Sequence, residues 1–207
     1  MGVETIRRYA SMFGLNRPSG IEIPETTPEL TTEDPERSAM GQGTNSYSNV
    51  QLSRYVAALA NSGTVFDLSL LDKMTDSEGN LIKDYTPNVT GHVDIADSTW
   101  DAVHQGMRAV VTDGSVKAIF KDLEVEIAGK TGTAQESRTR GNHAFFISYG
   151  PYTNPEICVT VNIPYGYSSS NAAAVAKNIY RFYYGYTDLD SILGNGALEV
   201  SNVRVGD

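Results

Sequence analysis

The feature that most constrains the fold of this 207-residue chain is a set of closely spaced strand-like runs between residues 124 and 163. The first run, Glu124 to Ala134, begins with alternating polar and apolar residues, and the second, His143 to Tyr149, is rich in aromatic residues. In the third, Ile157 to Ile163, an aliphatic residue occupies every second position, the period of a strand with one buried face. Short loops join antiparallel neighbours, so the pattern predicts an antiparallel sheet.

A helical period follows the third run. A helix is predicted to start between Ser168 and Asn171 and to continue to Tyr184, and Gly185 is a typical residue at a helix end. Large apolar residues recur along it at helical spacing and are expected to face the sheet: Val175, Ile179, Phe182 and Tyr183. The predicted fold class is therefore α+β, an antiparallel sheet flanked by helices.

The first half of the chain combines helices with extended segments. Apolar residues at helical spacing predict helices over residues 4–13, 48–62 and 98–110. The segment Asn16 to Glu36 is rich in Pro, Thr and Glu, which is typical of an extended surface segment, and Gly20 to Ile23 within it is strand-like. Residues Asp67 to Tyr85 alternate weakly around Ser77 to Asn80 and predict a hairpin.

Composition excludes several classes of function. The chain is 40% hydrophobic and 20% charged, as globular proteins are, and its net charge of -9 argues against binding to nucleic acid. No apolar run is long enough to span a membrane, and no signal peptide is expected at the start. The single cysteine excludes an internal disulfide, and the three histidines lack the spacing of metal ligands. Neither a metal nor another cofactor is expected.

Within the first strand-like run, Lys130-Thr131-Gly132-Thr133 combines the groups that an anion-binding site needs. A lysine can project its ammonium into a cleft, Gly132 leaves room for a ligand against the backbone, and threonine hydroxyls can bind a carboxylate. The backbone N–H of Thr133 can donate to a developing oxyanion. Strict alternation sets Lys130 on the opposite face from both threonines, so the three can share a ligand only around an exposed strand edge.

The string Lys130 to Gln135 resembles the third signature motif of the penicillin-binding proteins, the serine transpeptidases of bacterial cell-wall synthesis. Other segments resemble the same family in matching order: Tyr9 to Pro24, Met40 to Gly43, Gln51 to Asn61, His143 to Phe146 and Pro151 to Val161. The resemblance identifies residues 1–185 as the C-terminal portion of a transpeptidase domain of the class B, monofunctional, elongation type. Residues 186–207 are expected to form a C-terminal tail.

The resemblance implies a partial serine transpeptidase or β-lactamase-like domain with roles for the matching residues. Lys130 would anchor the carboxylate of substrate or β-lactam and tune a proton relay. Thr131 and Thr133 would bind that carboxylate, beside Gly132, and the Thr133 N–H would form half of the oxyanion hole. The implied reaction is attack by an active serine on a D-Ala-D-Ala stem peptide, then acyl transfer to an amine on a neighbouring strand.

The implied partners are peptidoglycan stem peptides, β-lactams and the cell-wall elongation machinery, with no nucleic acid. The implied location is the extracytoplasmic face of the bacterial membrane. The sequence departs from the family pattern at the nucleophile, because no serine of the chain is followed three residues later by lysine. A formal Ser-x-Asn match, Ser169 to Asn171, follows the third motif and lies at a predicted helix start.

The expectation is therefore a transpeptidase domain without its first part, membrane anchor and dimerisation module, and without activity alone. The alternative is a non-catalytic β-lactam sensor or a degenerate penicillin-binding domain. A secreted serine β-lactamase fits less well with the Pro/Thr-rich segment and with the extended string from Lys130 to Gln135.

Overall fold

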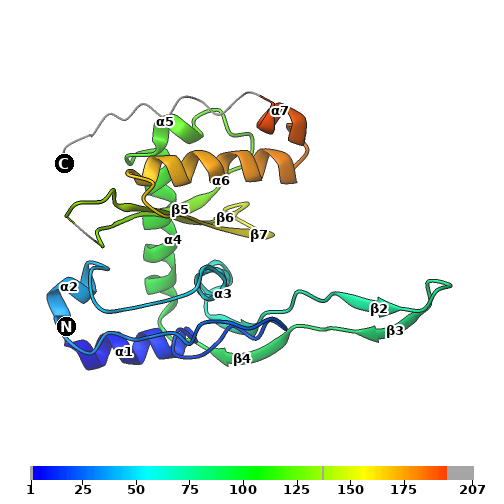
Figure 1. The fold of residues 1–207 in the computed structure, drawn as a ribbon, viewed down its shortest axis with the longest axis horizontal. Coiled ribbons are helices and arrows are strands. Elements are labelled where there is room, and N and C mark those ends of the chain that lie inside the picture. Colours follow the sequence, from blue (N-terminus) through cyan, green and yellow to red (C-terminus); the bar gives the residue numbers. More distant parts are fainter. Residues whose placement is uncertain (1, 137, 195–207) are drawn as a thin grey trace. The chain divides into compact units, whose positions relative to one another are not determined.

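The computed structural model describes residues 2–136 and 138–194. The chain divides into two compact units, with the boundary between His104 and Gln105. The first unit contains α1 (Val3–Met12), α2 (Pro35–Ala39), α3 (Asn49–Ala60), β1 (Thr64–Asp67), β2 (Lys73–Thr75), β3 (Leu81–Asp84) and β4 (Asn88–His92) (Figure 1). Helix α4 (Asp97–Thr112) crosses the boundary. The second unit contains α5 (Lys117–Phe120), β5 (Ala128–Ala134), β6 (His143–Gly150), β7 (Ile157–Ile163), α6 (Ser169–Tyr183) and α7 (Leu189–Leu193).

Local signals explain where the helices of the first unit begin and end. Ser48 caps α3 with a capping box: its hydroxyl accepts from the Gln51 N–H at 3.2 Å, and the Gln51 side chain accepts from the Ser48 N–H at 2.9 Å. Gly14, at φ +77°, follows the end of α1, as glycine favours a left-handed position. The sequence predicts a helix that begins with Ser98 as its cap, whereas α4 starts at Asp97 and Ser98 lies inside its first turn.

The predicted hairpin of residues 67–85 is confirmed in its central part. Strands β2 and β3 pair antiparallel around a turn in which the Asp76 carboxylate accepts the backbone N–H groups of Glu78 and Asn80. Every residue of β2 and β3 is exposed, and the ribbon extends away from the other elements of its unit (Figure 1). A second antiparallel pair, β1 and β4, completes the strands of this unit.

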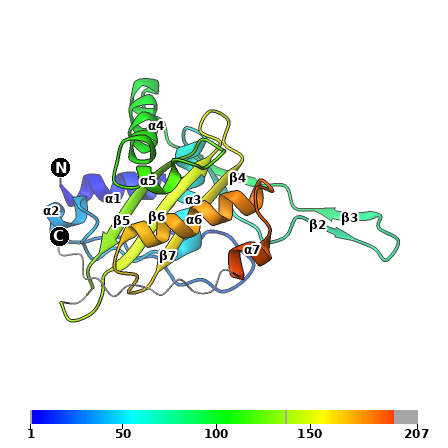
Figure 2. The ribbon, with the colours of Figure 1, turned by 90° about the horizontal axis from the view of Figure 1, so that it is seen from above.

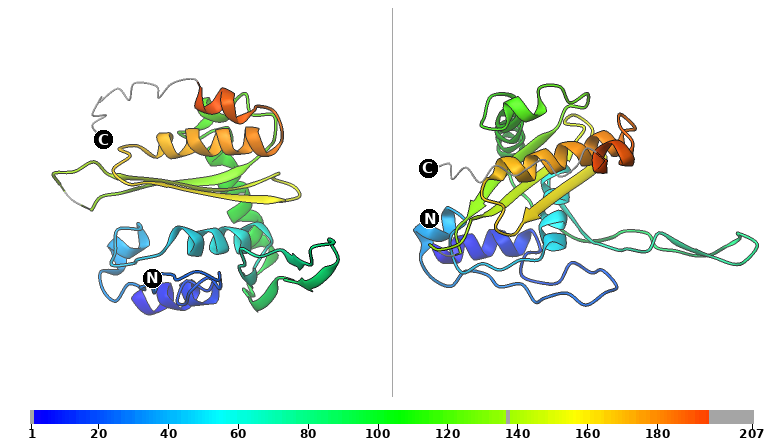
Figure 3. Two further views of the ribbon diagram at one scale, coloured as in Figure 1. Left: turned by 45° about the vertical axis from the view of Figure 1, so that its right-hand side comes forward. Right: turned by 45° about the horizontal axis from the view of Figure 1, so that its top comes forward.

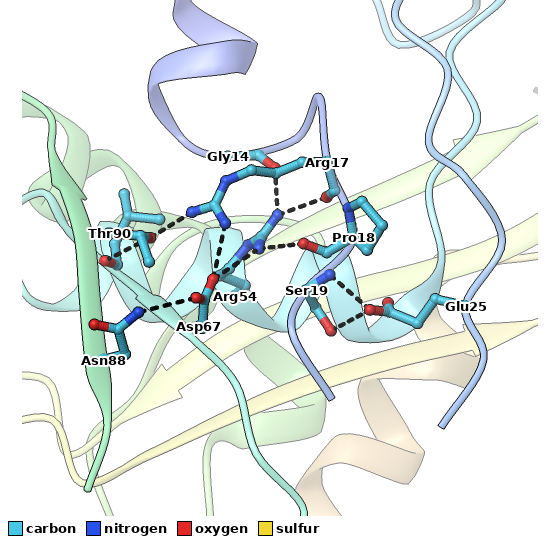
Figure 4. A network of polar contacts seen from close by, with 10 residues as sticks. Gly14, Arg17, Pro18, Ser19, Glu25, Arg54, Asp67, Asn88 and Thr90 are labelled. Carbon is cyan, nitrogen blue, oxygen red and sulfur yellow. Dashed lines mark hydrogen bonds and ion pairs between the residues drawn. The ribbon is translucent and has the colours of Figure 1, made fainter. Parts of the chain in front are cut away.

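A buried arginine organises the segment that follows α1. The Arg54 side chain is fully buried and donates to the carbonyl oxygens of Pro18 at 2.6 Å, Arg17 at 2.8 Å and Gly14 (Figure 4). The next turn is held by Glu25, which accepts from the N–H of Ser19 at 2.6 Å and from its hydroxyl at 2.7 Å. These contacts bend the chain here, so residues 20–23 form no strand and that prediction is wrong.

The second unit is built on a three-stranded antiparallel sheet in the order β5-β6-β7, as predicted. Helix α6 runs across one face of this sheet (Figures 2 and 3). Ser168 caps the helix, since its hydroxyl accepts from the Ser170 N–H. The core under α6 contains buried residues of the sheet and the helix: Ala144, Phe146, Val159, Val161, Ala172, Ala173, Ala176 and Tyr180. The predicted α+β class is confirmed.

The predicted inner face of α6 is wrong. Val175, Ile179, Phe182 and Tyr183 are between 38% and 53% exposed, whereas the alanines at 172, 173 and 176 are fully buried with Tyr180. The sheet already supplies large side chains such as Phe146, so small residues let the helix backbone approach closely. A pattern weighted by side-chain size therefore selected the opposite face.

The first strand of the sheet begins at Ala128 and not at Glu124. The residues before it are drawn toward α6, because Asp122 pairs with Lys177 at 2.6 Å and Glu124 approaches Arg181 at 3.9 Å. Of the predicted tail, residues 195–207 lie outside the described residues, and its division from residues 1–185 stays a prediction. Within the described ranges, no helix has both the length and the apolar character needed to cross a bilayer.

Candidate active site

The motif Lys130 to Thr133 lies on β5, which forms one edge of the three-stranded sheet. Its register against β6 sets Lys130 opposite Ile147, Thr131 opposite Phe146, Gly132 opposite Phe145 and Thr133 opposite Ala144. The prediction that this strand runs antiparallel to residues 143–149 is therefore confirmed. An edge strand leaves one row of backbone groups without a neighbouring strand, so a ligand can approach the backbone there.

Directly opposed residues of an antiparallel pair share a face of the sheet. The two threonines share the face of Ala144 and Phe146, which are fully buried under α6. Lys130 lies on the other face, as alternation predicts, but its ammonium donates to the carbonyl oxygen of Thr131 at 2.8 Å. The long side chain thus returns to the strand backbone, which brings the cation to the carbonyl of Thr131. Lys130 and Thr133 are exposed, and Thr131 is partly buried.

Packing restricts the two glycines of β5 to different degrees. A Cβ atom at Gly132 would lie 3.3 Å from the Cβ of Phe145, which is a tight contact. At Gly129 the Cβ would lie 2.5 Å from the Phe146 ring, so no side chain fits there without displacing the core. The strand itself carries no signal for this role of Gly129, because the role depends on the Phe146 ring of the neighbouring strand.

A cluster of polar and aromatic side chains adjoins the end of β5. The Glu136 carboxylate lies 3.0 Å from Nε2 of His143 and accepts from the hydroxyl of Tyr165 at 3.3 Å. Arg140 donates to the same hydroxyl at 2.9 Å. The hydrogen bond from His143 is the main cause that holds the pKa of Glu136 below its ordinary value, with a smaller contribution from Tyr165. His143 itself starts β6 opposite Ala134.

Tyr165 was not identified from the sequence, since it lies 29 residues from Glu136. Its backbone has φ +55°, and Tyr167 has φ +62°, which is uncommon for residues other than glycine. The Tyr167 N–H donates to the carbonyl of Asn142 at 2.9 Å, so the loop after β7 is joined to the loop before β6. Unusual backbone at a loop near a strand edge is often associated with a functional site.

The formal Ser-x-Asn match has a structural role at the start of α6. Ser169 is the first helical residue, and the Asn171 side chain donates to the carbonyl of Gly166 at 2.8 Å. This supports the interpretation of the match as part of a helix start.

Two cavities of the described residues lie away from the motif. One of about 490 Å³, in the first unit, has Arg7, Asn16 and Glu29 in its lining. The other, of about 380 Å³, lies in the second unit beside α5. Neither is lined by Lys130 to Thr133.

Comparison with known proteins decides the family. Residues 1–181 match the penicillin binding protein transpeptidase domain. The chain belongs to this family. It is 28% identical to the peptidoglycan D,D-transpeptidase MrdA of Haemophilus influenzae, over 88% of this chain and 33% of the relative. It is 30% identical to penicillin-binding protein 2A of Bacillus subtilis, over 81% of this chain and 26% of the relative.

Solved structures agree with this transpeptidase assignment. Penicillin-binding protein 2B of Streptococcus pneumoniae strain R6 superposes with a TM-score of 0.79 at 26% identity, over 90% of this chain and 33% of that chain. The Pseudomonas aeruginosa PBP2 in complex with WCK 5153 gives 0.72 at 27% identity, over 88% of this chain and 44% of that chain. The chain thus spans about a third of the length of the curated relatives it matches.

Proposed function

We propose that this chain supplies the anion-binding strand of a serine D,D-transpeptidase, and that β5 holds the carboxylate of a D-Ala-D-Ala stem peptide or a β-lactam. The observation that carries the proposal is the motif Lys130 to Thr133 on an edge strand, within a chain that matches the transpeptidase family over residues 1–181. In this proposal, the hydroxyls of Thr131 and Thr133 and the ammonium of Lys130 bind the carboxylate, and Gly132 lets the peptide lie against the strand.

The proposed reaction has two acyl transfers. A serine hydroxyl attacks the carbonyl of the penultimate D-Ala, the peptide bond to the terminal D-Ala breaks, and that residue leaves as an amine that takes the proton. The N–H of Thr133 donates to the oxygen that carries negative charge in the transition state, and Lys130 assists proton transfer. An amine of a neighbouring stem peptide then attacks the ester and releases the serine.

The serine comes from a part of the domain that the 207 residues do not contain, since no serine among them has lysine three positions later. We therefore propose that the chain is inactive alone. We also propose that the intact protein acts outside the cytoplasmic membrane, on peptidoglycan and together with cell-wall elongation proteins. A relative at 26% identity was solved as part of a peptidoglycan synthase complex, which supports this assignment.

A second candidate is a non-catalytic domain that binds β-lactams reversibly. It needs only the carboxylate-binding groups of Lys130, Thr131 and Thr133, which the chain contains. The two candidates differ in covalent labelling, because only a protein with an activated serine forms an adduct with penicillin.

The test compares labelling by fluorescent penicillin in the 207-residue chain and in a version extended by the residues encoded upstream of Met1. We expect no band from the chain itself and a band from the extended version. Lys130→Ala in the extended version is expected to reduce the labelling rate by about tenfold or more, equivalent to about 1.4 kcal/mol of barrier. Lys83→Ala, an exposed lysine of β3, serves as the matched control and should label normally.

Two results would contradict the proposal. Unchanged labelling of the Lys130→Ala version would remove the role assigned to the motif. A band from the 207-residue chain that is abolished when the chain is boiled before labelling would show that a serine of this chain performs the chemistry. An extended version without Ser-x-x-Lys and without labelling would favour the non-catalytic candidate.

A further inference from the structure

The second unit contains a cavity of about 380 Å³ between the end of α4, helix α5 and the segment that leads into β5. Its floor is apolar, because Val111, Phe120 and Ile127 are at most 5% exposed. Leu123 and Val125 extend this apolar lining and pack against the core of the unit. Cavities of roughly 300–1,000 Å³ that combine apolar walls with polar groups are typical of small-molecule sites.

Cationic side chains surround this apolar floor. Arg108, Lys117 and Lys121 line the cavity together with one carboxylate, Glu126. Arg108 donates hydrogen bonds to the Glu126 carboxylate at 2.7 Å and to the carbonyl of Ile127 at 2.8 Å. Lys117 is 64% exposed, and its contact with an aspartate is 4.0 Å long, the limit of an ion pair. In a chain of net charge -9, this is a local reversal of sign that attracts anions.

The wall of the cavity is held in position by contacts on its outer side. Asp122 pairs with Lys177 of α6 at 2.6 Å, and Glu124 approaches Arg181 of the same helix at 3.9 Å. The apolar residues that alternate with these two acids line the cavity. The walls are therefore formed without a ligand, which lowers the ordering cost of binding.

We propose that this cavity binds a small amphipathic anion, with an alkyl or aryl body on the apolar floor and a phosphate or carboxylate at Lys117 and Lys121. A neutral apolar ligand would leave the two lysines without an anionic group from the ligand. A bare anion would leave the apolar floor exposed to water. Residues Lys130 to Thr133 do not line the cavity, so this site is separate from the strand edge proposed to hold the stem-peptide carboxylate.

The test titrates the chain with octyl phosphate below its micelle concentration and follows backbone amide shifts by NMR, with affinity from calorimetry. Octanoate tests a carboxylate on the same tail. Octyl glucoside supplies the tail without charge, and inorganic phosphate supplies the charge without the tail. We expect octyl phosphate or octanoate to bind with the largest shifts around Leu123 and Val125, and both control probes to bind at least about tenfold more weakly.

The charge-reversal variant Lys117→Glu/Lys121→Glu is expected to weaken binding by about tenfold or more, because two attractive charges become repulsive. Lys83→Glu on β3 makes the same substitution in the other unit and should leave affinity unchanged. Equal weakening by Lys83→Glu, or none by the double variant, would overturn the proposal. Shift mapping on the unmodified chain tests it independently of any variant: absence of binding, or shifts centred on Phe182 and Tyr183 of the exposed face of α6, would also overturn it.

Discussion

The hairpins β2–β3 and β6–β7 have the same topology but opposite environments. Both are antiparallel pairs that the sequence predicts from alternation and turn residues. Every residue of β2 and β3 is exposed, whereas Phe146 and Val159 in β6 and β7 are almost completely buried under α6. Alternation and a turn signal are therefore enough to predict a hairpin, but they do not reveal whether a helix covers it.

The difference determines where the stability of each hairpin comes from. An isolated two-stranded ribbon is marginal in water, and β2–β3 relies on backbone pairing and on the hydrogen bonds of Asp76 in its turn. In β6–β7, apolar burial against the helix contributes most. The buried hydroxyls of Tyr180 and Ser148 add a hydrogen bond of 3.0 Å between helix and sheet.

The largest expected effect is the contrast between Phe146→Ala and Ile82→Ala. Phe146 is fully buried and stacks on Phe120 with ring centroids 5.3 Å apart, so its truncation should lower the free energy of unfolding by about 3–5 kcal/mol. Ile82 is 60% exposed, and its truncation should change that free energy by less than about 0.5 kcal/mol. Urea denaturation of both variants measures the difference, and equal losses would contradict the assigned core.

A smaller effect is expected from the hydroxyl pair. Ser148 donates to the carbonyl of Val159 at 3.2 Å and accepts from Tyr180. Ser148→Ala leaves the buried tyrosine hydroxyl without its acceptor and should cost about 1–3 kcal/mol. Tyr180→Phe removes the hydroxyl and with it the need for a hydrogen-bond acceptor. It should cost about 1 kcal/mol, because Ser148 keeps its carbonyl partner. The ranking would be refuted by a larger loss in Tyr180→Phe than in Ser148→Ala in the same denaturation assay.

Local signals were the reliable part of the sequence analysis. The helix predicted over residues 48–62 corresponds to α3, and the pairing of β5, β6 and β7 follows from short connections. The errors arise from contacts between residues far apart in the chain. Residues 20–23 form no strand, and Glu22 among them accepts from the hydroxyl of Ser69 and the N–H of Leu70. The large apolar residues of α6 face away from a sheet that packs on alanines.

In the candidate site, too, features with a local signal were predicted and features that depend on distant residues were not. Its motif on β5 was identified by resemblance, and alternation correctly set Lys130 across the strand from Thr131. The contact of Glu136 with Tyr165, 29 residues away, had no local signal. The same holds for the cavity beside α5, whose lining combines residues of two helices and an irregular segment. Properties of this kind depend on tertiary packing, which one strand or helix does not encode.

The smallest expected effect concerns acid and the turn of β2–β3. The Asp76 carboxylate accepts from the Asn80 side chain at 2.9 Å and from the backbone N–H groups of Glu78 and Asn80. The Asn80 side chain is the main cause that lowers the pKa of Asp76 below its ordinary value of 3.8. Because the pKa is lower in the folded turn, the ionised carboxylate stabilises the turn at any pH above the ordinary pKa. This contribution is lost as the pH falls through the folded value.

We therefore expect the Asn80 amide to lose protection, measured as its exchange rate relative to that of an unstructured amide at the same pH, as the pH falls through the folded pKa of Asp76. Amides of β6 keep their protection, because burial holds them. Exchange measured by NMR between neutral and strongly acidic pH tests this, with the Asp76 carboxyl titrated in the same samples. Asp76→Asn is the matched variant, since its amide oxygen can still accept the two backbone hydrogen bonds of the turn but the side chain does not titrate. If the Asn80 amide shows the same acid response in Asp76→Asn, or if β6 opens at the same pH as β2–β3, then the two hairpins do not differ in the way that their burial implies.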